Sequence, residues 1–344
     1  MSKTLYGLPY MGSKNAIVPY ILNALPSAKN FYDLFAGGCS ITHGAMLTNK
    51  WNNFIINDLN GEITQLFIDA INGKFKNEKR WISREDFFKL KDTEPYVAYC
   101  WSFGNNPDKK YLYGEYIEPW KKALHYARVL NDYSLLKEMG IESNGTRIDI
   151  GKHEQEYKQK YIEWYKKHYD YDSLSKVNKI GLENLESLQR LQRLQSLERL
   201  QSLQSLERLQ SLERLERLQS LERLERFNCD YSEVPIKPNS VIYCDIPYEN
   251  TASYKCGEFD HKRFYDWANK QTELVIISSY EISDNRFMEI DFIKKASIMN
   301  NTNVEERTYK LEKLFIPKRQ KELYERMMNR KVEVPEHNEQ LKLF

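Results

Sequence analysis

Four short apolar segments, separated by stretches of helical periodicity, constrain the fold of this chain more than any other feature. The apolar segments are residues 31–35, 54–57, 241–244 and 274–278. The helical patterns are residues 40–48, 61–71 and 261–272. Strands that read as continuous apolar runs are buried on both faces, which is typical of parallel sheets covered by helices. The order of the segments therefore predicts an α/β fold with a parallel sheet.

The far edge of this sheet is expected to lie near the end of the chain. Residues 296–299 and 314–316 are predicted to add a terminal pair of strands. From Lys318 onward, the sequence predicts a surface helix and then a loose tail over residues 331–344, because no periodic apolar face continues there.

A long segment of different character separates the two halves of the sheet. Residues 74–180 contain 21 Lys or Arg, 17 Asp or Glu, and 20 Phe, Tyr or Trp. Helical patterns dominate residues 113–128 and 153–168. The aromatic residues form either the core of a helical insertion or a surface on which aromatic and cationic side chains contact nucleic acid. Both interpretations stay open, since different faces of the insertion can serve both purposes.

Residues 182–226 form a leucine triplet repeat. Leucine occurs at every third position from Leu182 to Leu224, fifteen times, with eight Glu and eight Arg in between. A three-residue step rotates the leucine stripe around an α-helix, so the repeat does not match a coiled-coil heptad. A 3₁₀-helix would align the leucines but is rarely long, and the L-x-L strand and Asn position of a leucine-rich solenoid are missing. High helix propensity favours an α-helix over a solenoid.

Composition narrows the possible functions. The net charge of +2 means that any basic surface for nucleic acid must be local. The chain begins without a signal-peptide pattern, and no segment approaches the roughly 18 apolar residues of a membrane span. The five cysteines are scattered and include no Cys-x-x-Cys pair. This cysteine pattern predicts a cytoplasmic location and argues against a structural zinc site.

The first candidate site follows the apolar run at residues 241–244. The run stops abruptly at Asp245, Ile246, Pro247 and Tyr248. Proline fixes φ and removes a backbone donor, so the neighbouring carbonyls do not continue a strand ladder. A carboxylate and these carbonyls can accept hydrogen bonds from an exocyclic amino group, while the tyrosine ring stacks on the ring that carries this group. The alternative interpretation is an ordinary strand end with a turn.

The second candidate site is a glycine-rich turn between the first strand and the following helix. Residues 33–39 read Asp-Leu-Phe-Ala-Gly-Gly-Cys, and such a turn lets a ligand approach the backbone at a helix N-terminus. Asp58 ends the next strand, at a place suited to the two hydroxyls of a ribose. Asp58 is alternatively the N-cap of the helix after it.

A lysine near the N-terminus is a third candidate. Residues 9–14, Pro-Tyr-Met-Gly-Ser-Lys, precede an amphipathic helical pattern. Lys14 is either a solvated cation or a group that pairs with the carboxylate of a bound ligand.

Together and in this order, the segments resemble the D12 class of adenine-specific DNA methyltransferases, the Dam-like group. The family pattern is a Gly-Lys motif, then D-x-F-x-G-x-G, then a target-recognition insertion, then D-P-P-Y. The counterparts here are residues 10–14, 33–39, 74–226 and 245–248. Flanking residues that also match the family are Asn250, Thr251 and Tyr254, residues 228–231, and residues 312–316. The resemblance covers roughly residues 4–70 and 227–317.

The resemblance implies a Rossmann-like class I methyltransferase sheet with a mostly helical inserted recognition domain. The expected parts are a catalytic domain of residues 1–73 and 227–330, an inserted target-recognition domain of residues 74–181, the repeat of residues 182–226, and the tail of residues 331–344. Two positions depart from the family pattern. Ile246 stands where the family has its first proline, and Cys39 replaces the last glycine, where a side chain crowds the approach to the cofactor.

The resemblance also implies methyl transfer from S-adenosylmethionine to N6 of adenine in DNA, without a metal. Adenine N6 is inaccessible in a duplex, so the nucleotide must be extruded into a pocket. The implied catalytic residues are Asp245, Pro247 and Tyr248, with Asp245 accepting from the amino group and Tyr248 stacking on the base. The implied cofactor pocket is lined by Tyr10, Lys14, Asp33, Phe35, Gly37, Asp58, Asp230 and Asp245.

Other functions remain open from the sequence. Methylation of cytosine N4 uses a similar amino group, although the acidic Asp245 favours adenine; methylation of protein glutamine usually pairs with Asn at this position. A catalytically lapsed DNA-binding protein that self-associates through the leucine repeat is an alternative of a different class. The expected partner is double-stranded DNA, a cognate restriction endonuclease is a further candidate, and the sequence leaves the oligomeric state undetermined.

Overall fold

The structure, a computed structural model, describes residues 6–106, 110–141, 150–170, 174, 223–249, 259–296 and 309–329. The chain divides into two compact units. We call them the sheet unit (Met1–Leu8, Gly12–Ile71 and Arg214–Phe344) and the helical unit (Pro9–Met11 and Asn72–Glu213). No helix within the described ranges is both long enough and apolar enough to cross a membrane.

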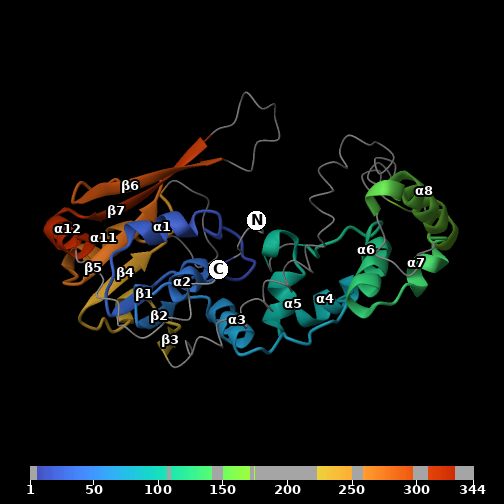
Figure 1. Cartoon of the computed structure of the whole chain (residues 1–344), viewed down its shortest axis with the longest axis horizontal. Coiled ribbons are helices and arrows are strands. Elements are labelled where there is room, and N and C mark those ends of the chain that lie inside the picture. The colour runs from blue at the N-terminus through green and yellow to red at the C-terminus, as the bar shows by residue number, and fades with distance from the viewer. Residues whose placement is uncertain are drawn as a thin grey trace, which may run out of the picture. The chain divides into compact units, whose positions relative to one another are not determined.

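In the described part of the sheet unit, seven strands form one sheet with the order β3-β2-β1-β4-β5-β7-β6 (Figure 1). The strands are β1 (Asn30–Asp33), β2 (Asn53–Asn57), β3 (Leu224–Phe227), β4 (Ser240–Cys244), β5 (Leu274–Ser279), β6 (Phe287–Ala296) and β7 (Tyr309–Pro317). β1 to β5 pair in parallel, whereas β7 is antiparallel to both β5 and β6. The predicted α/β sheet is therefore confirmed, and an antiparallel pair extends one edge of it.

Two strands differ from the sequence-based expectation. Residues 224–226, which we assigned to the leucine repeat, belong to β3 and pair with β2, from Phe54 opposite Leu224 onward. The backbone groups on that side of β2 need partners, and pairing overrides the local leucine pattern. The rest of the repeat and the tail of residues 331–344 lie outside the described residues.

The second difference concerns the terminal strand pair. β7 contains residues 314–316 as predicted, but its partner β6 begins at Phe287 rather than near residue 296. β6 is an edge strand with exposed Glu289 and Phe292 and a bulge before Asp291, so it lacks the continuous apolar run that marks a central strand. Residues 297–299 of the expected strand lie outside the described residues.

Helices cover both faces of the sheet. In the sheet unit they are α1 (Val18–Ala24), α2 (Ser40–Met46), α3 (Gly61–Ile71), α11 (His261–Lys270) and α12 (Lys321–Met328), with 3₁₀ turns η8 (Tyr231–Glu233) and η10 (Lys318–Gln320). Tyr32 and Ile242 point to the face where they pack with Phe264 of α11 in one buried cluster. Alternate residues of the same strands point to the opposite face, where Asp33 meets Thr42 of α2.

The helical unit has an aromatic core. Its elements are α4 (Arg84–Leu90), α5 (Pro95–Cys100), η1 (Phe103–Asn105), α6 (Glu118–His125), the π turn η2 (Tyr126–Leu130), α7 (Ser134–Glu138) and α8 (Ile150–His168). Tyr96, Tyr99 and Trp101 are each at most 3% exposed, which supports the core interpretation for these rings. The helix predicted over residues 113–128 begins only at Glu118, because Pro119 suits the first turn of a helix and not its interior.

Candidate active site

The turn after β4 places the Asp245 carboxylate at the carboxyl end of the central strand. Every residue of β4 is buried, and Leu34 donates its backbone N–H to the Tyr243 carbonyl at 3.1 Å, which joins the ends of β1 and β4. His261 Nε2 donates to the Pro247 carbonyl at 2.8 Å and holds the turn that follows. The Asp245 side chain keeps 23% of its surface exposed. This carboxylate is thus fixed by a buried strand but remains accessible to a ligand.

Lys14 joins this turn to β7. Its Nζ lies 3.1 Å from Asp245 Oδ1 and 3.1 Å from Glu312 Oε1, and the side chains of Lys14 and Glu312 are only 7% and 1% exposed. Ser278 Oγ donates to Glu312 Oε1 at 2.6 Å. Residues that are far apart in the sequence therefore form one buried ionic cluster, which consists of Lys14, Asp245, Tyr248, Ser278 and Glu312.

The hydroxyl of Tyr248 lies at the centre of the ionic cluster. It accepts a hydrogen bond from Lys14 Nζ, donates to Glu312 Oε1, and lies 3.3 Å from Asp245 Oδ1. Lys14 Nζ also lies 4.6 Å from the ring centroid, and the ring of Tyr280 packs edge-on at 4.4 Å. Both contacts to Asp245 use Oδ1, so neither occupies Oδ2. The ring of Tyr248 is held by its hydroxyl end, which fixes its orientation.

The charges of the ionic cluster shift one another's pKa values. Burial lowers the pKa of Lys14, but the adjacent charges of Asp245 and Glu312 outweigh this and raise it. Burial tends to raise the pKa of Glu312, but Lys14 and the hydrogen bonds from Ser278 and Tyr248 together lower it. Burial raises the pKa of Asp245, against the opposing effect of Lys14, and the charge of Glu312 raises it further. The lysine and glutamate are thus favoured as an ion pair, and Asp245 is the carboxylate that is easier to protonate.

The glycine-rich turn lies at the carboxyl ends of β1 and β2. Gly37 adopts φ of 46° and donates its N–H to Asp58 Oδ2 at 2.8 Å, while Asn60 donates to Asp58 Oδ1 at 2.8 Å. Asp58 therefore ties the turn to the end of β2 and remains half-buried. Each of its oxygens keeps a further lone pair for a ligand hydroxyl.

Asp33 and Cys39 show how the turn is built. Thr42 Oγ1 donates to Asp33 Oδ2 at 2.7 Å, and burial raises the pKa of Asp33 to about 7 although this hydrogen bond opposes the shift. Burial also raises the pKa of Asp58. Cys39 precedes α2 at φ of 55°, a left-handed conformation that costs about 1 kcal/mol for a residue with a side chain. Glycine would adopt this left-handed conformation without strain. Cys39 therefore replaces the family's last glycine at a position where glycine is favoured.

The family model of the D12 class N6 adenine-specific DNA methyltransferases matches residues 10–283. The chain belongs to this family. A search of curated proteins found no match. As a D12-class methyltransferase, the protein transfers a methyl group from S-adenosylmethionine to N6 of adenine in DNA. The match spans the Lys14 segment, the glycine-rich turn and the Asp245 turn, and it ends before β7.

The residues at the strand ends of this methyltransferase suit the cofactor. S-adenosylmethionine carries a cationic sulfonium, and Asp33 is electrostatically coupled to Asp245 and Asp58. This acidic group produces a negative potential at the ends of β1, β2 and β4. Asp58 is accessible to ribose hydroxyls, and the left-handed Gly37 lets a ligand approach the backbone. The chemistry of these residues therefore fits the family's cofactor.

Other residues of the implied cofactor pocket have different surroundings. Phe35 is half-buried and its ring packs 5.5 Å from Tyr231. Asp230 forms a two-point ion pair with Arg263, at 2.7 and 3.0 Å, and hydrogen bonds, led by that from Arg263, lower its pKa against the effect of its partial burial. Tyr10 belongs to the helical unit, where its ring lies 5.9 Å from Tyr99.

Two members of the ionic cluster, Glu312 and Ser278, have no role that the sequence predicts. Glu312 was part of the motif that resembles a late family strand, but its side chain had no partner in that pattern. A signal was present in retrospect, because Glu312 shares a strand face with the buried Leu314 and Ile316, and a glutamate on such a face needs an internal partner. The partner could not be read from the sequence, since the ion pair with Lys14 joins residues about 300 positions apart.

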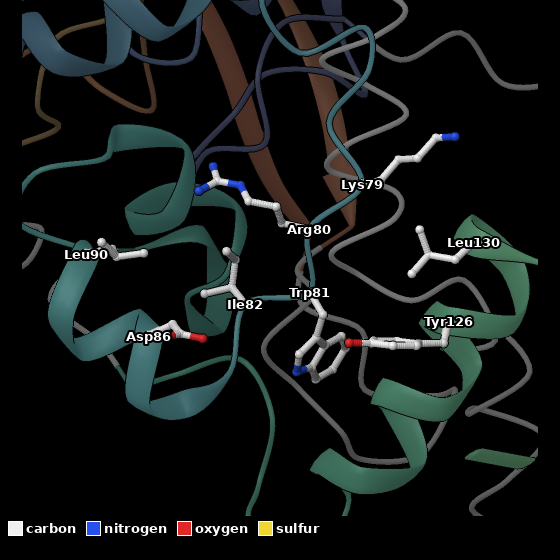
Figure 2. Close-up of a pocket in the computed structure, with 8 residues that line it drawn as sticks. All are labelled: Lys79, Arg80, Trp81, Ile82, Asp86, Leu90, Tyr126 and Leu130. Carbon is white, nitrogen blue, oxygen red and sulfur yellow. The ribbon is translucent and has the colours of Figure 1, made fainter. Parts of the chain in front are cut away.

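The helical unit contains a separate pocket of about 500 Å³ (Figure 2). Its lining residues are Lys79, Arg80, Trp81, Ile82, Asp86, Leu90, Tyr126 and Leu130. Figure 2 shows the Tyr126 side chain directed toward the Trp81 ring. Trp81 also stacks on Tyr113 with ring centroids 5.7 Å apart, so part of this aromatic surface belongs to the core and part faces the pocket.

Proposed function

We propose that Asp245 and Tyr248 hold the target adenine during methyl transfer, with Pro247 shaping the turn between them. One observation carries this proposal: a buried ionic cluster fixes both side chains, while the Asp245 carboxylate keeps 23% of its surface exposed. A fixed and accessible acceptor is what an exocyclic amino group requires. Because orientation supplies much of the rate enhancement in such a transfer, a rigid acceptor favours catalysis.

Each side chain has a defined task. Asp245 accepts a hydrogen bond from N6 and directs the nitrogen lone pair, and its negative charge stabilises the positive charge that develops on N6 as the new bond forms. Tyr248 stacks on the extruded base and offsets part of the cost of unstacking, which is a few kcal/mol. When bound, S-adenosylmethionine supplies a methyl group that its sulfonium already activates. The protein therefore contributes mainly orientation and electrostatics.

The cofactor pocket in this proposal is lined by residues of the sheet unit: Lys14, Asp33, Phe35, Gly37, Asp58, Asp230 and Asp245. Tyr10, which the family resemblance also implies, belongs to the helical unit and remains a prediction from the sequence. The open side of the Asp58 carboxylate, the left-handed Gly37 and the acidic surroundings of Asp33 support this assignment. Lys14 has two carboxylate partners of its own, so its part in the pocket is to position Asp245.

The proposed substrate form is double-stranded DNA, contacted in part by the helical unit. Lys79 and Arg80 lie beside the half-buried rings of Trp81 and Tyr126, a combination of cations and aromatic rings that suits nucleic acid. A cytoplasmic location is part of this proposal, supported by free thiols at Cys39, Cys100, Cys229 and Cys244. A cognate restriction endonuclease remains a prediction.

The decisive experiment is methyl transfer from radiolabelled S-adenosylmethionine to unmethylated duplex DNA, followed by nucleoside analysis. We expect label in N6-methyladenine with the natural protein. Asp245→Ala should reduce transfer at least about 1,000-fold, because the amino group loses its acceptor. Calorimetry should show that the cofactor still binds this variant. Glu289→Gln, which alters an exposed carboxylate of β6 in the same unit, is the matched control and should retain activity.

Two results would contradict the assignment. Near-normal transfer by Asp245→Ala would remove this residue from its role, and label in N4-methylcytosine would reassign the target base. Absence of label with intact DNA binding would support a catalytically lapsed protein. Mapping methylated adenines in DNA from cells that express the protein would then identify the recognition sequence.

A further inference from the structure

Glu312 is a buried charge outside the part of the chain that the family model matches. It lies in β7, its side chain is 1% exposed, and its register partner on β6 is Ile293. The family match ends at residue 283. Nevertheless, Glu312 contacts two residues of the matched motifs, Lys14 and Tyr248.

Stability does not explain a carboxylate at this position. Burying a charge costs several kcal/mol, and a buried ion pair often stabilises a fold less than apolar residues of the same volume. The cost is higher here, because Glu312 Oε2 is buried without a hydrogen-bond partner among the described residues. A feature that costs stability beside reacting groups points to a role in the reaction.

We propose that Glu312 is a positioning residue for methyl transfer. The Glu312 carboxylate accepts hydrogen bonds from the Lys14 ammonium and the Tyr248 hydroxyl. Asp245 is therefore not the only acceptor for these two groups. Asp245 thereby keeps acceptor capacity for the adenine amino group, and the Tyr248 ring keeps the orientation needed for stacking. This inference rests on the proposed roles of Asp245 and Tyr248.

Charge and geometry each contribute to this role. Six side chains contact or electrostatically influence the Glu312 carboxylate: Lys14, Ser278, Tyr248, Asp245, Tyr243 and Tyr280. Lys14 is the cation of this group and two carboxylates share it, so the site carries net negative charge when both are ionised. This charge suits the positive charge that passes to N6 during transfer. The Glu312 charge also raises the pKa of Asp245, after the larger effects of burial and Lys14.

The test uses Glu312→Gln in the full-length protein. The side chain keeps its shape and loses its charge, so Lys14 turns to Asp245 and competes with the adenine amino group. We expect single-turnover transfer to fall by about 10- to 100-fold, with dissociation constants for cofactor and DNA within about threefold of the natural protein. The acid limb of the pH–rate profile should move to lower pH, because removing the Glu312 charge lowers the pKa of Asp245. A purely structural residue would leave that limb in place.

Three further variants separate charge from position. Glu312→Asp keeps the charge but shortens the side chain, so it should retain the natural acid limb with a reduced rate. Glu289→Gln on β6, whose carboxylate pairs with Lys313 at 3.3 Å, makes the same chemical change at an exposed position and should leave both rate and profile unchanged. In a Lys14→Met background, Glu312→Gln should cause a smaller further loss than it does in the natural protein, because only the contact with the Tyr248 hydroxyl remains to be weakened.

The outcomes distinguish this inference from the proposed function. If Asp245→Ala is inactive but Glu312→Gln keeps a rate within twofold and the natural acid limb, the role of Glu312 is wrong and that of Asp245 stands. If Asp245→Ala is itself active, both assignments fail. Should Glu312→Gln not fold, Glu312→Asp and Ser278→Ala still decide the matter, since each must slow transfer without weakening cofactor binding.

Discussion

The sheet unit of this methyltransferase contains the buried ionic cluster around Lys14, whereas the cations in the ion pairs of the helical unit are more exposed. Lys14 and Glu312 are 7% and 1% exposed, whereas Arg80 and Lys89 are 48% and 63% exposed in their ion pairs. The helical unit instead buries tyrosine and tryptophan rings, such as Tyr99 and Trp101. Exposed ion pairs contribute little to stability, while buried ones are costly to assemble. The comparison supports the proposal that the buried ionic cluster serves methyl transfer, whereas the buried rings of the helical unit form an ordinary packed core.

The largest expected effect is that of removing the cation of the ionic cluster. Lys14→Met leaves the carboxylates of Asp245 and Glu312 close together without a counter-charge. We expect the free energy of unfolding to fall by about 3–5 kcal/mol and methyl transfer to fall at least about 100-fold. Urea unfolding and single-turnover kinetics measure the two effects. Lys237→Met, which removes a 45% exposed cation of the same unit, is the control and should change neither by much.

A second prediction concerns the pH dependence of stability at Asp33. Its pKa is about 7 in the folded protein against an ordinary value of 3.8, so the folded state binds the proton more tightly than the unfolded chain does. The stability from this group is therefore present below pH 3.8 and is lost as the pH rises toward 7. Asp33→Asn removes the cost of ionising a buried carboxyl group. Relative to the natural protein, we expect the free energy of unfolding of this variant to increase over this pH window by at most about 4 kcal/mol.

The measurement is urea unfolding of both proteins in steps from about pH 4 to about pH 8, which brackets the window of this titration. A constant difference between them across this range would contradict the assignment of a raised pKa to Asp33. Because Asp33 is also assigned to the cofactor pocket, the stabilised variant should bind S-adenosylmethionine more weakly. The expected gain in stability and loss of affinity together would show that this buried carboxylate serves binding.

The same contrast explains how much of the molecule could be predicted from its sequence. Strands β1, β2, β4 and β5 are buried almost throughout and were found, because central strands are covered on both faces. β3 was hidden because Leu224 continues the triplet pattern, and β6 because polar residues interrupt its apolar face. Edge strands are specified by their neighbours, which no local pattern reveals.

In the active site, local motifs were readable and long-range contacts were not. Asp245, Asp33 and Asp58 lie at the ends of strands, so the parallel sheet brings them to one edge, as their pKa coupling indicates. Glu312 comes from an antiparallel strand in the middle of its length, and only the register of β7 against β5 places it beside Lys14. The left-handed conformation of Cys39 was likewise invisible, because the residue type argues against it.

A third prediction concerns the packing of the N-terminal segment on the glycine-rich turn. Gly7 has φ of +62°, and a Cβ there would lie 2.4 Å from the Gly38 carbonyl oxygen. Leu8 donates to the same carbonyl at 2.7 Å, so the segment cannot move away freely. Gly7→Ala should lower the free energy of unfolding by about 3 kcal/mol, combining backbone strain with a backbone clash.

Gly12→Ala is the matched control for Gly7→Ala. Gly12 has φ of +83°, but a methyl group added there would meet no atom of the described residues within 4 Å, so only the backbone term of about 1 kcal/mol applies. Urea unfolding of the two variants therefore separates strain from close packing. Equal losses would show that the segment can retreat from the glycine-rich turn.

The smallest expected effect comes from the exposed charges of the helical unit. Arg80 pairs with Glu78 and Glu94, each at 2.9 Å, with 48% of its own side chain exposed. Arg80→Met should change the free energy of unfolding by less than about 1 kcal/mol, and high salt should remove the difference. Urea unfolding at low and high salt measures this effect.

DNA affinity gives a second, independent readout for Arg80. If Arg80 also contacts a phosphate, the slope of log Kd against log salt should fall by about 0.9 in Arg80→Met, whereas Lys89→Met on α4 serves as the exposed control. An unchanged slope together with unchanged stability would make Arg80 an ordinary solvated cation. In that case the exposed charge of Arg80 would serve neither stability nor DNA binding, in contrast to the buried ionic cluster of the sheet unit.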